Sequence, residues 1–537
     1  MKIFYFLFIT AFIATSIDAQ TFTNVADINP SGNSSINYLY QHQGELIFRA
    51  DNGTQGVEFW SSDGTTAGTQ LVQDINAGSG SSSPLNFSSL GSNLIFTATE
   101  GTAGQELYLY DGTTTSLLKD INPGAASSQP YNFQELNGKL FFRANNGTIG
   151  SELWSTDGTT AGTVLIKDIN PGSGSGMTTI LAASANNIYF VADNGTTGKE
   201  LWISDGTATG TTLLKDINPS GSSLSAFSKF IEISPGNFIF EANDGGTTGY
   251  ELWRTDGTTA GTVLVKDINP GSNNGLPDLG VVANGKLYFE ADNGSDGKEL
   301  WITDGTTAGT NMVKDINPGA GTSSCTRFTE HNGKIYFSAE DGINGKELWV
   351  TDGTSAGTNM LIDINIGAGN GFPERITNYN GNLLFIADDG VNGDELYLSD
   401  GTTAGTSVIQ PAISPNASPL QSTTQFVELN GELYFGANYD SKGHELWKLN
   451  IDVPLSVTDI KNTAVIDIFP NPTKNKLSLV YAGQINSVNI QNIAGQIIPV
   501  PYKNSHKEIF LGNLPAGFYT ITINTEEGIV TRKFIKE

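Results

Sequence analysis

A repeat of about 48 residues occupies most of this 537-residue chain and limits the folds that it can adopt. Residues 120–167 and 267–314 are both 48 residues long and share Asp-Ile-Asn-Pro-Gly, Asn-Gly, Glu-Leu-Trp and Asp-Gly-Thr in the same order. An aromatic residue ends the Glu-Leu-Trp step or its variant in nine copies, at spacings of 46 to 51 residues: Trp60, Tyr108, Trp154, Trp202, Trp253, Trp301, Trp349, Tyr397 and Trp447.

Each repeat predicts four strands, which in the third copy are 131–136, 139–144, 152–156 and 163–169. Asn137-Gly138 is a hairpin signal, because a type I′ turn needs positive φ at both central residues. Apolar residues at successive positions of the second strand suit sheets that are buried on both faces. The prediction is an all-β fold with a large β-propeller of nine four-stranded blades.

The two ends of the repeat region predict how such a ring closes. The ninth copy, residues 411–450, has three strands and lacks the fourth, whereas residues 21–28 have the pattern of a fourth strand with nothing before it. Pairing them would remove two exposed sheet edges. An open or split arrangement of the blades is the alternative.

Glu-Leu-Trp-x-x-Asp-Gly-Thr, or a near variant, recurs eight times and resembles the ELWxxDGT repeat family of secreted bacterial proteins. The resemblance covers about 430 residues and implies a propeller-like secreted or surface protein. It implies no particular activity.

The ends of the chain differ from the repeats. Residues 1–19 carry Lys2, an apolar stretch and Ala19, which is typical of a secretory signal peptide and too short for a membrane span. We expect a propeller over 20–452, a linker over 453–463 and a small β-sandwich over 464–537. Residues 20–463 contain 20 basic and 49 acidic residues, whereas 464–537 contain seven basic and five acidic ones.

The C-terminal segment resembles the type A C-terminal sorting domain of the type IX secretion system of Bacteroidetes. The resemblance rests on Phe-Pro-Asn-Pro at 469–472, Ala-Gly-Gln at 494–496, Leu-Pro-Ala-Gly-Phe-Tyr at 514–519 and Arg-Lys-Phe-Ile-Lys at 532–536. It implies export through the periplasm to the outer cell surface or the medium, with the secretion machinery as partner. The residues that carry the sorting signal would be Pro470, Asn471, Pro472, Gly517, Tyr519, Lys533 and Lys536. An ordinary accessory module is the alternative.

Composition excludes several functions. A net charge of -27 opposes binding to nucleic acid. One cysteine, Cys325, cannot form an intrachain disulfide, and four scattered histidines suggest neither zinc nor a catalytic triad. No segment after the signal peptide is apolar enough to span a membrane.

Acidic residues recur at three positions of the repeat, represented by Asp120, Glu152 and Asp157 in the third copy. A catalytic carboxylate pair is needed once in a protein, whereas carboxylates that accept backbone N–H bonds are needed in every repeat, so we interpret these series as structural. The Trp series is expected to fill the space between blades, with each indole N–H reaching a backbone carbonyl.

The rim formed by the loops between second and third strands and by the linkers between repeats varies most, and such loops often carry recognition. We select Asp292, Glu340, Asp341, Asp388 and Asp389 on this rim as candidate ligand-binding residues. The sequence indicates no cofactor other than calcium, which prefers oxygen ligands, and no catalytic residue. The expected function is a non-catalytic binding or adhesion scaffold for an extracellular polysaccharide or a surface protein. The alternative is a glycosidase or lyase with its site on the propeller axis.

Overall fold

The computed structural model describes residues 20–184, 186–409, 419–420, 424–451, 467–480, 485–492, 497–498, 502–503, 507–512, 514–525 and 528–537. The chain divides into a unit of residues Met1–Asp452 and a unit of residues Val453–Glu537. The described residues form strands and turns and contain no helix, so no helix among them could cross a membrane. The expected signal peptide at 1–19 and linker at 453–463 lie outside the described residues.

Nine four-stranded antiparallel sheets are formed by the described residues of the first unit. Sheets one to three contain β2 (Asn37–His42), β3 (Glu45–Asp51), β4 (Val57–Ser62) and β5 (Gln70–Gln73); β6 (Leu85–Leu90), β7 (Asn93–Glu100), β8 (Gly104–Tyr110) and β9 (Thr115–Lys119); and β10 (Tyr131–Leu136), β11 (Lys139–Asn145), β12 (Ser151–Thr156) and β13 (Val164–Lys167). Sheets four to six contain β14 (Met177–Ser184), β15 (Asn187–Asp193), β16 (Lys199–Ser204) and β17 (Thr212–Lys215); β18 (Phe230–Ser234), β19 (Asn237–Asn243), β20 (Tyr250–Thr255) and β21 (Val263–Lys266); and β22 (Asp278–Ala283), β23 (Lys286–Asp292), β24 (Lys298–Thr303) and β25 (Asn311–Lys314). Sheets seven and eight contain β26 (Thr326–His331), β27 (Lys334–Glu340), β28 (Lys346–Thr351) and β29 (Asn359–Ile362); and β30 (Glu374–Tyr379), β31 (Asn382–Asp388), β32 (Asp394–Ser399) and β33 (Thr406–Ile409).

Sheet nine combines the two ends of the first unit. Its strand order is β1 (Gln20–Ala26), β36 (Glu445–Ile451), β35 (Glu432–Ala437) and β34 (Val427–Leu429). β1 runs antiparallel to β36, with Thr21 opposite Asn450 and Phe22 opposite Leu449. The N-terminal segment therefore supplies the fourth strand that the ninth repeat lacks, as the sequence predicts.

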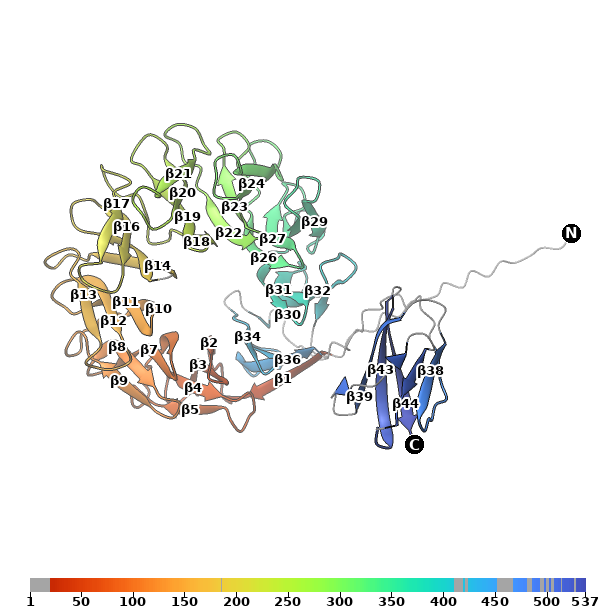
Figure 1. The fold of residues 1–537 in the computed structure, drawn as a ribbon. Coiled ribbons are helices and arrows are strands. Elements are labelled where there is room, and N and C mark those ends of the chain that lie inside the picture. The colour runs from red at the N-terminus through yellow and green to blue at the C-terminus, as the bar shows by residue number, and fades with distance from the viewer. Residues whose placement is uncertain are drawn as a thin grey trace. The chain divides into compact units, whose positions relative to one another are not determined.

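Neighbouring sheets pack face to face in a propeller-like arrangement, and Figure 1 shows them following one another along a curve. The second strands have apolar side chains on both faces: Leu287, Tyr288 and Phe289 of β23 are all buried. Between sheets three and four, Phe141 and Leu153 of one sheet pack with residues of the next. Asn137 and Gly138 have φ of 53° and 76°, as a type I′ turn requires.

The recurring glutamates hold the linkers between sheets. Glu200, which is fully buried, accepts the backbone N–H groups of Ile217 at 2.8 Å and Ser223 at 3.1 Å, and the Ser223 hydroxyl at 2.6 Å. The Asp of the Asp-Gly-Thr turn caps its own turn: Asp63 accepts the N–H of Thr65 at 2.8 Å. These contacts agree with the structural interpretation of the two series.

The tryptophans are 5 to 8% exposed and lie between sheets. The ammonium groups of Lys215, Lys266 and Lys314 lie 5.6 to 5.9 Å from the ring centres of Trp253, Trp301 and Trp349 of the following sheet. The indole N–H groups of the seven tryptophans have no hydrogen-bond partner among the described residues. The packing prediction is therefore supported, and the predicted bond from the indole N–H to a backbone carbonyl is wrong for these seven tryptophans.

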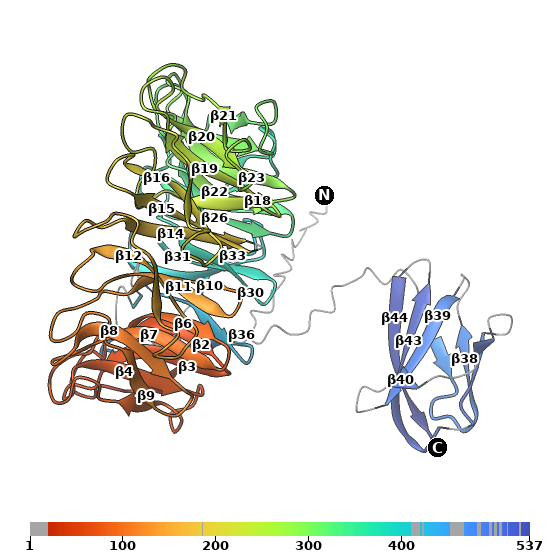
Figure 2. The same cartoon turned by 60° about the vertical axis from the view of Figure 1, so that its left-hand side comes forward.

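The second unit contains two four-stranded sheets around its own core (Figure 2). One has the order β37 (Asp467–Phe469), β38 (Lys476–Val480), β42 (Glu508–Phe510) and β41 (Tyr502–Lys503). The other has the order β40 (Ile497–Ile498), β39 (Ile485–Asn492), β43 (Gly517–Thr525) and β44 (Gly528–Lys536). Leu477, Ile490, Ile509 and Ile521 are fully buried in this core.

Candidate functional site

The loops between second and third strands contact the linkers that connect the sheets, and together they form what we call the variable rim. The linker 365–372 lies between sheets seven and eight: Lys346 accepts the N–H of Gly371 and that of Phe372 at 3.0 Å through its carbonyl, and Gly371 accepts the N–H of Asp388 at 2.8 Å. The backbone N–H groups of Asp292 and Glu340 likewise donate to carbonyls of the linkers that precede their sheets. The variable loops are therefore placed on a rigid frame, as the sequence predicts.

The five carboxylates selected on this rim form part of the turns. Asp292 and Asp388 accept the N–H groups of Gly294 at 2.6 Å and Gly390 at 2.7 Å. Glu340 accepts the hydroxyl of Ser324 at 3.0 Å. Asp292 and Asp388 thus stabilise their own loops, whereas Glu340 ties its loop to the preceding linker.

Asp341 and Asp389 are similarly engaged. Asp341 accepts the N–H groups of Ile343 and Asn344 at 2.9 and 2.8 Å, and Asp389 accepts those of Val391 and Asn392 at 2.8 Å. Burial alone would raise the pKa of Asp341, but these hydrogen bonds outweigh it and lower the pKa below its ordinary value. The N–H of Asn392 lowers the pKa of Asp389 in the same way.

The structure does not bring the five carboxylates together at one point. They belong to loops of three different sheets, and no group of three or more His, Cys, Asp or Glu side chains that could hold a metal occurs among the described residues. Calcium takes 6 to 8 oxygen ligands. Because the carboxylates lie in loops of three sheets and the four aspartates already accept hydrogen bonds within their turns, this donor set does not fit a calcium ion.

A cavity that sequence reasoning missed lies beside the Glu340 loop, between sheets seven and eight. Its volume is about 210 Å³, and its lining residues are Thr326, Arg327, Ser338, Lys346, Phe372, Pro373 and Glu374. We call it the Phe372 cavity. The start of β26 lies opposite the end of β27, with Thr326 paired with Ser338, and the linker then brings Phe372 and Glu374 alongside.

Charged groups and a buried hydroxyl give the Phe372 cavity its chemistry. Arg327 and Glu374 form an ion pair at 3.3 Å. The Lys346 ammonium forms no ion pair or hydrogen bond with the part of the chain that the structure describes. Ser338 is 1% exposed, and its hydroxyl has no hydrogen-bond partner among the described residues.

Exposed apolar residues lie in the linker 365–372 and in the two loops that contact it. Ile343 and Val391 are 73% and 81% exposed and occupy a loop position that holds Thr or Ser in most other repeats. Ile366, 88% exposed, stands where most repeats have Pro. A Cβ atom at Gly390 would lie 2.6 Å from the Asn365 side chain, so the Val391 loop contacts the linker that carries Ile366. The repeat is thus altered at several neighbouring surface positions.

Two further carboxylates interrupt the repeat. Glu241 and Glu290 occupy a position of the second strand that carries Arg, Thr, Val, Ser, Ile or Gly in the other repeats. Burial raises the pKa of Glu241 to about 7 and also raises that of Glu290. Glu290 accepts the N–H of Cys325 at 2.7 Å and lies 4.0 Å from Lys298, so structural contacts hold it.

A larger cavity of about 320 Å³ is lined by residues of the first strands of sheets one and eight and by residues at the start of β34, including Leu39, Arg375 and Phe426. Its lining, as far as the structure describes it, includes no carboxylate. It therefore lacks the carboxylate pair expected of a glycosidase.

In the second unit, two parts of the predicted sorting signal lie together. The Asn471 side chain donates to the carbonyl of Lys533 at 3.0 Å and accepts the N–H of Ile535 at 2.9 Å. Tyr519 is buried and donates its hydroxyl to the carbonyl of Pro515 at 2.9 Å. Lys533 is exposed, whereas Lys536 is buried. The Pro470–Pro472 segment is thereby attached to the last strand, which also carries Lys533 and Lys536.

Comparison with solved structures finds many remote similarities. PorZ, an essential bacterial surface component of the type-IX secretion system of Porphyromonas gingivalis, is 12% identical, with 94% of this chain and 82% of that chain covered and a TM-score of 0.25. The extracellular domain of BT4673 from B. thetaiotaomicron is 10% identical, with 95% and 81% covered and a TM-score of 0.29. One prolyl endopeptidase is 8% identical, with 83% and 55% covered and a TM-score of 0.37. No curated protein matches the sequence.

The C-terminal unit has a family match. Residues 467–537 match the secretion system C-terminal sorting domain family. These residues include the Pro470–Pro472 segment, Tyr519 and the last strand described above. The chain therefore carries a type IX C-terminal sorting domain, which implies export to the cell surface or secretion by that system.

Proposed function

We propose that the first unit is a closed propeller of nine blades that serves, after export, as a non-catalytic scaffold for binding an extracellular polysaccharide. Residues 1–19 would act as its signal peptide. The repeat, the four-stranded sheets and the sorting domain support this proposal.

Closure is supported by the contacts of sheet nine, which repeat those between consecutive sheets. Glu445 accepts the N–H groups of Ile28 at 2.8 Å and Ser34 at 3.2 Å, as Glu200 does for the linker that follows its own sheet. The Thr66 hydroxyl of sheet one donates to the carbonyl of Val25 in β1 at 2.6 Å. The Thr307 hydroxyl makes the same bond to Val265 of the preceding sheet at 2.7 Å.

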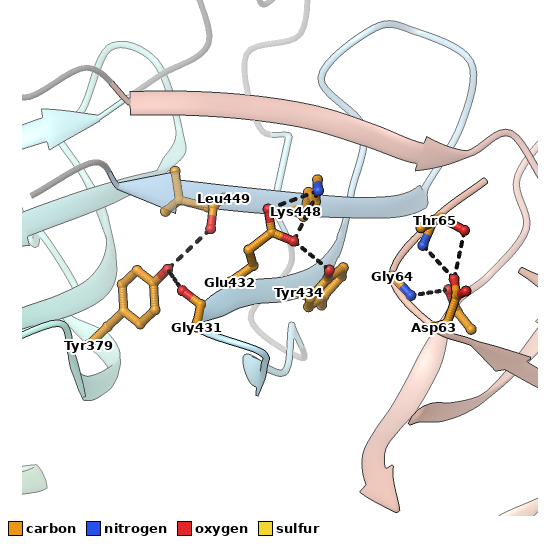
Figure 3. A network of polar contacts seen from close by, with 10 residues as sticks. Asp63, Gly64, Thr65, Tyr379, Gly431, Glu432, Tyr434, Lys448 and Leu449 are labelled. Atoms are coloured by element: carbon orange, nitrogen blue, oxygen red, sulfur yellow. Dashed lines mark hydrogen bonds and ion pairs between the residues drawn. The ribbon is translucent and has the colours of Figure 1, made fainter. Parts of the chain in front are cut away.

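Side chains on both borders of sheet nine also support closure of the ring (Figure 3). On one border, the Tyr379 hydroxyl of sheet eight donates to the carbonyls of Gly431 at 3.1 Å and Leu449 at 3.3 Å. On the other, Tyr434 packs against Gly64 in the Asp-Gly-Thr turn of sheet one. Tyr336 packs against Gly401 in the same way between sheets seven and eight. Sheet nine thus has a neighbour on each side.

The observation that carries the binding proposal is the altered surface of sheets seven and eight. Ile343, Ile366 and Val391 expose apolar side chains where other repeats mostly have Thr, Ser or Pro. Grouped exposed apolar residues with polar neighbours mark interaction sites. The packed interior of the repeat does not require these substitutions, because all three side chains lie outside it.

A glycan array probed with the purified chain 20–537, together with a hydrolase screen on the same glycans, tests the proposal. We expect saturable binding to at least one polysaccharide and no turnover. Turnover of a bound glycan would favour the enzyme alternative, and absence of binding to every glycan would contradict the proposed function.

A further inference from the structure

We propose that the Phe372 cavity is a subsite for a single neutral pyranose ring of the bound polysaccharide. This inference rests on the proposed function and specifies the site and the sugar class. The cavity, at about 210 Å³, has room for one ring and leaves the rest of a chain to lie over the rim.

Phe372 supplies an aromatic surface for the ring. Its side chain is 52% exposed and lines the cavity. Its backbone is held from both sides, because its N–H bonds to the Lys346 carbonyl at 3.0 Å and Pro373, whose φ is restricted, follows it. The face of an aromatic ring is electronegative and attracts the weakly positive C–H groups on one face of a pyranose. Other repeats have Ser, Gln, Leu or Met at this position, for example Ser324, Gln129, Leu276 and Met177.

The buried hydroxyl of Ser338 is the second observation that points to a ligand. A buried hydroxyl without a partner is costly, and native proteins keep few of them. Two corresponding polar side chains of other sheets do have partners: Thr97 donates to the Leu85 carbonyl at 3.1 Å, and Arg143 donates to Ser151 at 3.1 Å. Ser338 lines the cavity, so a sugar hydroxyl placed there would complete its hydrogen bonding.

The remaining polar groups can both donate to and accept from sugar hydroxyls. Lys346 offers three N–H donors that no described residue uses. The ion pair of Arg327 and Glu374 places donors and acceptors side by side at 3.3 Å. Such a mixed set suits hydroxyl groups, each of which is both a donor and an acceptor.

Charge favours a neutral ring over an acidic one. Glu340, Asp341, Asp388 and Asp389 lie in the adjoining loops, and residues 20–463 carry 29 more acidic than basic residues. A polyanion that approached the cavity would be repelled by this field. A neutral polysaccharide meets no such barrier.

Isothermal titration calorimetry of the chain 20–537 with cellohexaose, laminarihexaose, mannohexaose and maltohexaose tests the proposal, with hexagalacturonate as the acidic arm. We expect binding of at least one neutral oligosaccharide. Phe372→Ala should raise Kd about tenfold or more. The matched change Leu276→Ala, at the same repeat position of sheet six, should leave Kd unchanged.

Ser338→Ala separates a ligand role from a structural one. Removal of an unpartnered hydroxyl should leave the melting temperature of the free protein unchanged or raised, and should still weaken sugar binding. If the chain binds a neutral sugar and neither Phe372→Ala nor Ser338→Ala changes Kd, the assignment of the Phe372 cavity as the subsite is wrong, and the proposed function stands. Binding of hexagalacturonate alone would overturn the neutral class. Absence of binding to every glycan would overturn the cavity together with the proposed function.

Discussion

Glu445 accepts a 2.8 Å hydrogen bond from the backbone N–H of Ile28, although 417 positions separate the two residues in the chain. The bond joins the last repeat to the N-terminal linker in the way that Glu200 joins its sheet to the linker that follows. Because Glu445 is fully buried, its carboxylate depends on this linker for hydrogen bonds. The N-terminal segment is therefore part of the folded core.

Deletion of residues 20–26 should lower the melting temperature of the first unit markedly. The deletion leaves β36 with an unpaired edge and removes the buried Val25 and Ala26 from the packing between sheets nine and one. Differential scanning calorimetry would measure the change. A deletion variant that melts like the parent would show that β1 contributes little to stability.

Replacement of Glu200 by Ala should destabilise the first unit by about 3 kcal/mol or more, because two backbone N–H groups and one hydroxyl lose their buried acceptor. Glu428→Ala is the matched control, since Glu428 is exposed. Urea unfolding of both variants provides the comparison. Equal unfolding free energies for the two variants would contradict the structural role of the glutamate series.

The free energy of unfolding of the first unit should fall as the pH rises from 5 to 8. Burial raises the pKa of Glu152, Glu200, Glu251, Glu299 and Glu445 to about 7. The unfolded-state value is about 4.3, so the folded state binds more protons between these values. The stabilisation that these buried glutamates contribute is complete below a pH of about 4.3 and is lost as the pH rises through about 7.

Melting temperatures in buffers from pH 5 to 8 at constant ionic strength test this pH dependence. The Glu200→Gln variant should show a smaller decrease, because one of the titrating groups is absent. A melting temperature that rises with pH over this range would contradict the predicted linkage.

Deletion of residues 464–537 should stop export while the first unit remains folded, because the sorting domain is a separate compact unit. Cell fractionation would place the truncated chain in the periplasm, and proteolysis would show it folded. Normal secretion of the truncated chain would mean that export does not depend on this domain.

Much of the fold follows from local sequence. The predicted second strand of the third repeat, 139–144, corresponds to β11 at Lys139–Asn145, because Asn-Gly and Asn-Gly-Thr turns fix both of its ends. The sequence predicts that the fourth strand reaches residue 169, whereas β13 ends at Lys167. The N–H of Ile169 bonds to the Glu152 carboxylate at 2.9 Å instead of to a neighbouring strand. A side chain of β12 thus ends the hydrogen bonding between β12 and β13. Strand patterns in the sequence do not reveal such a contact.

The candidate site was less predictable. The variable loops of the repeat predict a binding rim, and the proposed cavity lies beside that rim. The sequence indicated carboxylates, whose oxygens the structure shows to be engaged in their own turns, as for Asp341. The Phe372 cavity depends on Ser338, Lys346 and Phe372 from two neighbouring sheets, and their proximity appears only in three dimensions. Phe372, in place of Ser, Gln, Leu or Met, is the sequence signal for this cavity.

A disulfide trap between β1 and β36 tests the proposed closure of the ring most directly. Thr21 and Asn450 are paired in register, and the native Cys325 is fully buried, so Thr21→Cys with Asn450→Cys places two accessible thiols at bonding distance. Thr21→Cys with Asn237→Cys, on sheet five, is the control. After mild oxidation, the account predicts an intramolecular crosslink in the first variant, seen as faster migration in non-reducing electrophoresis and absent from the control. Failure of the first variant to crosslink within the folded monomer would contradict closure by the N-terminal strand.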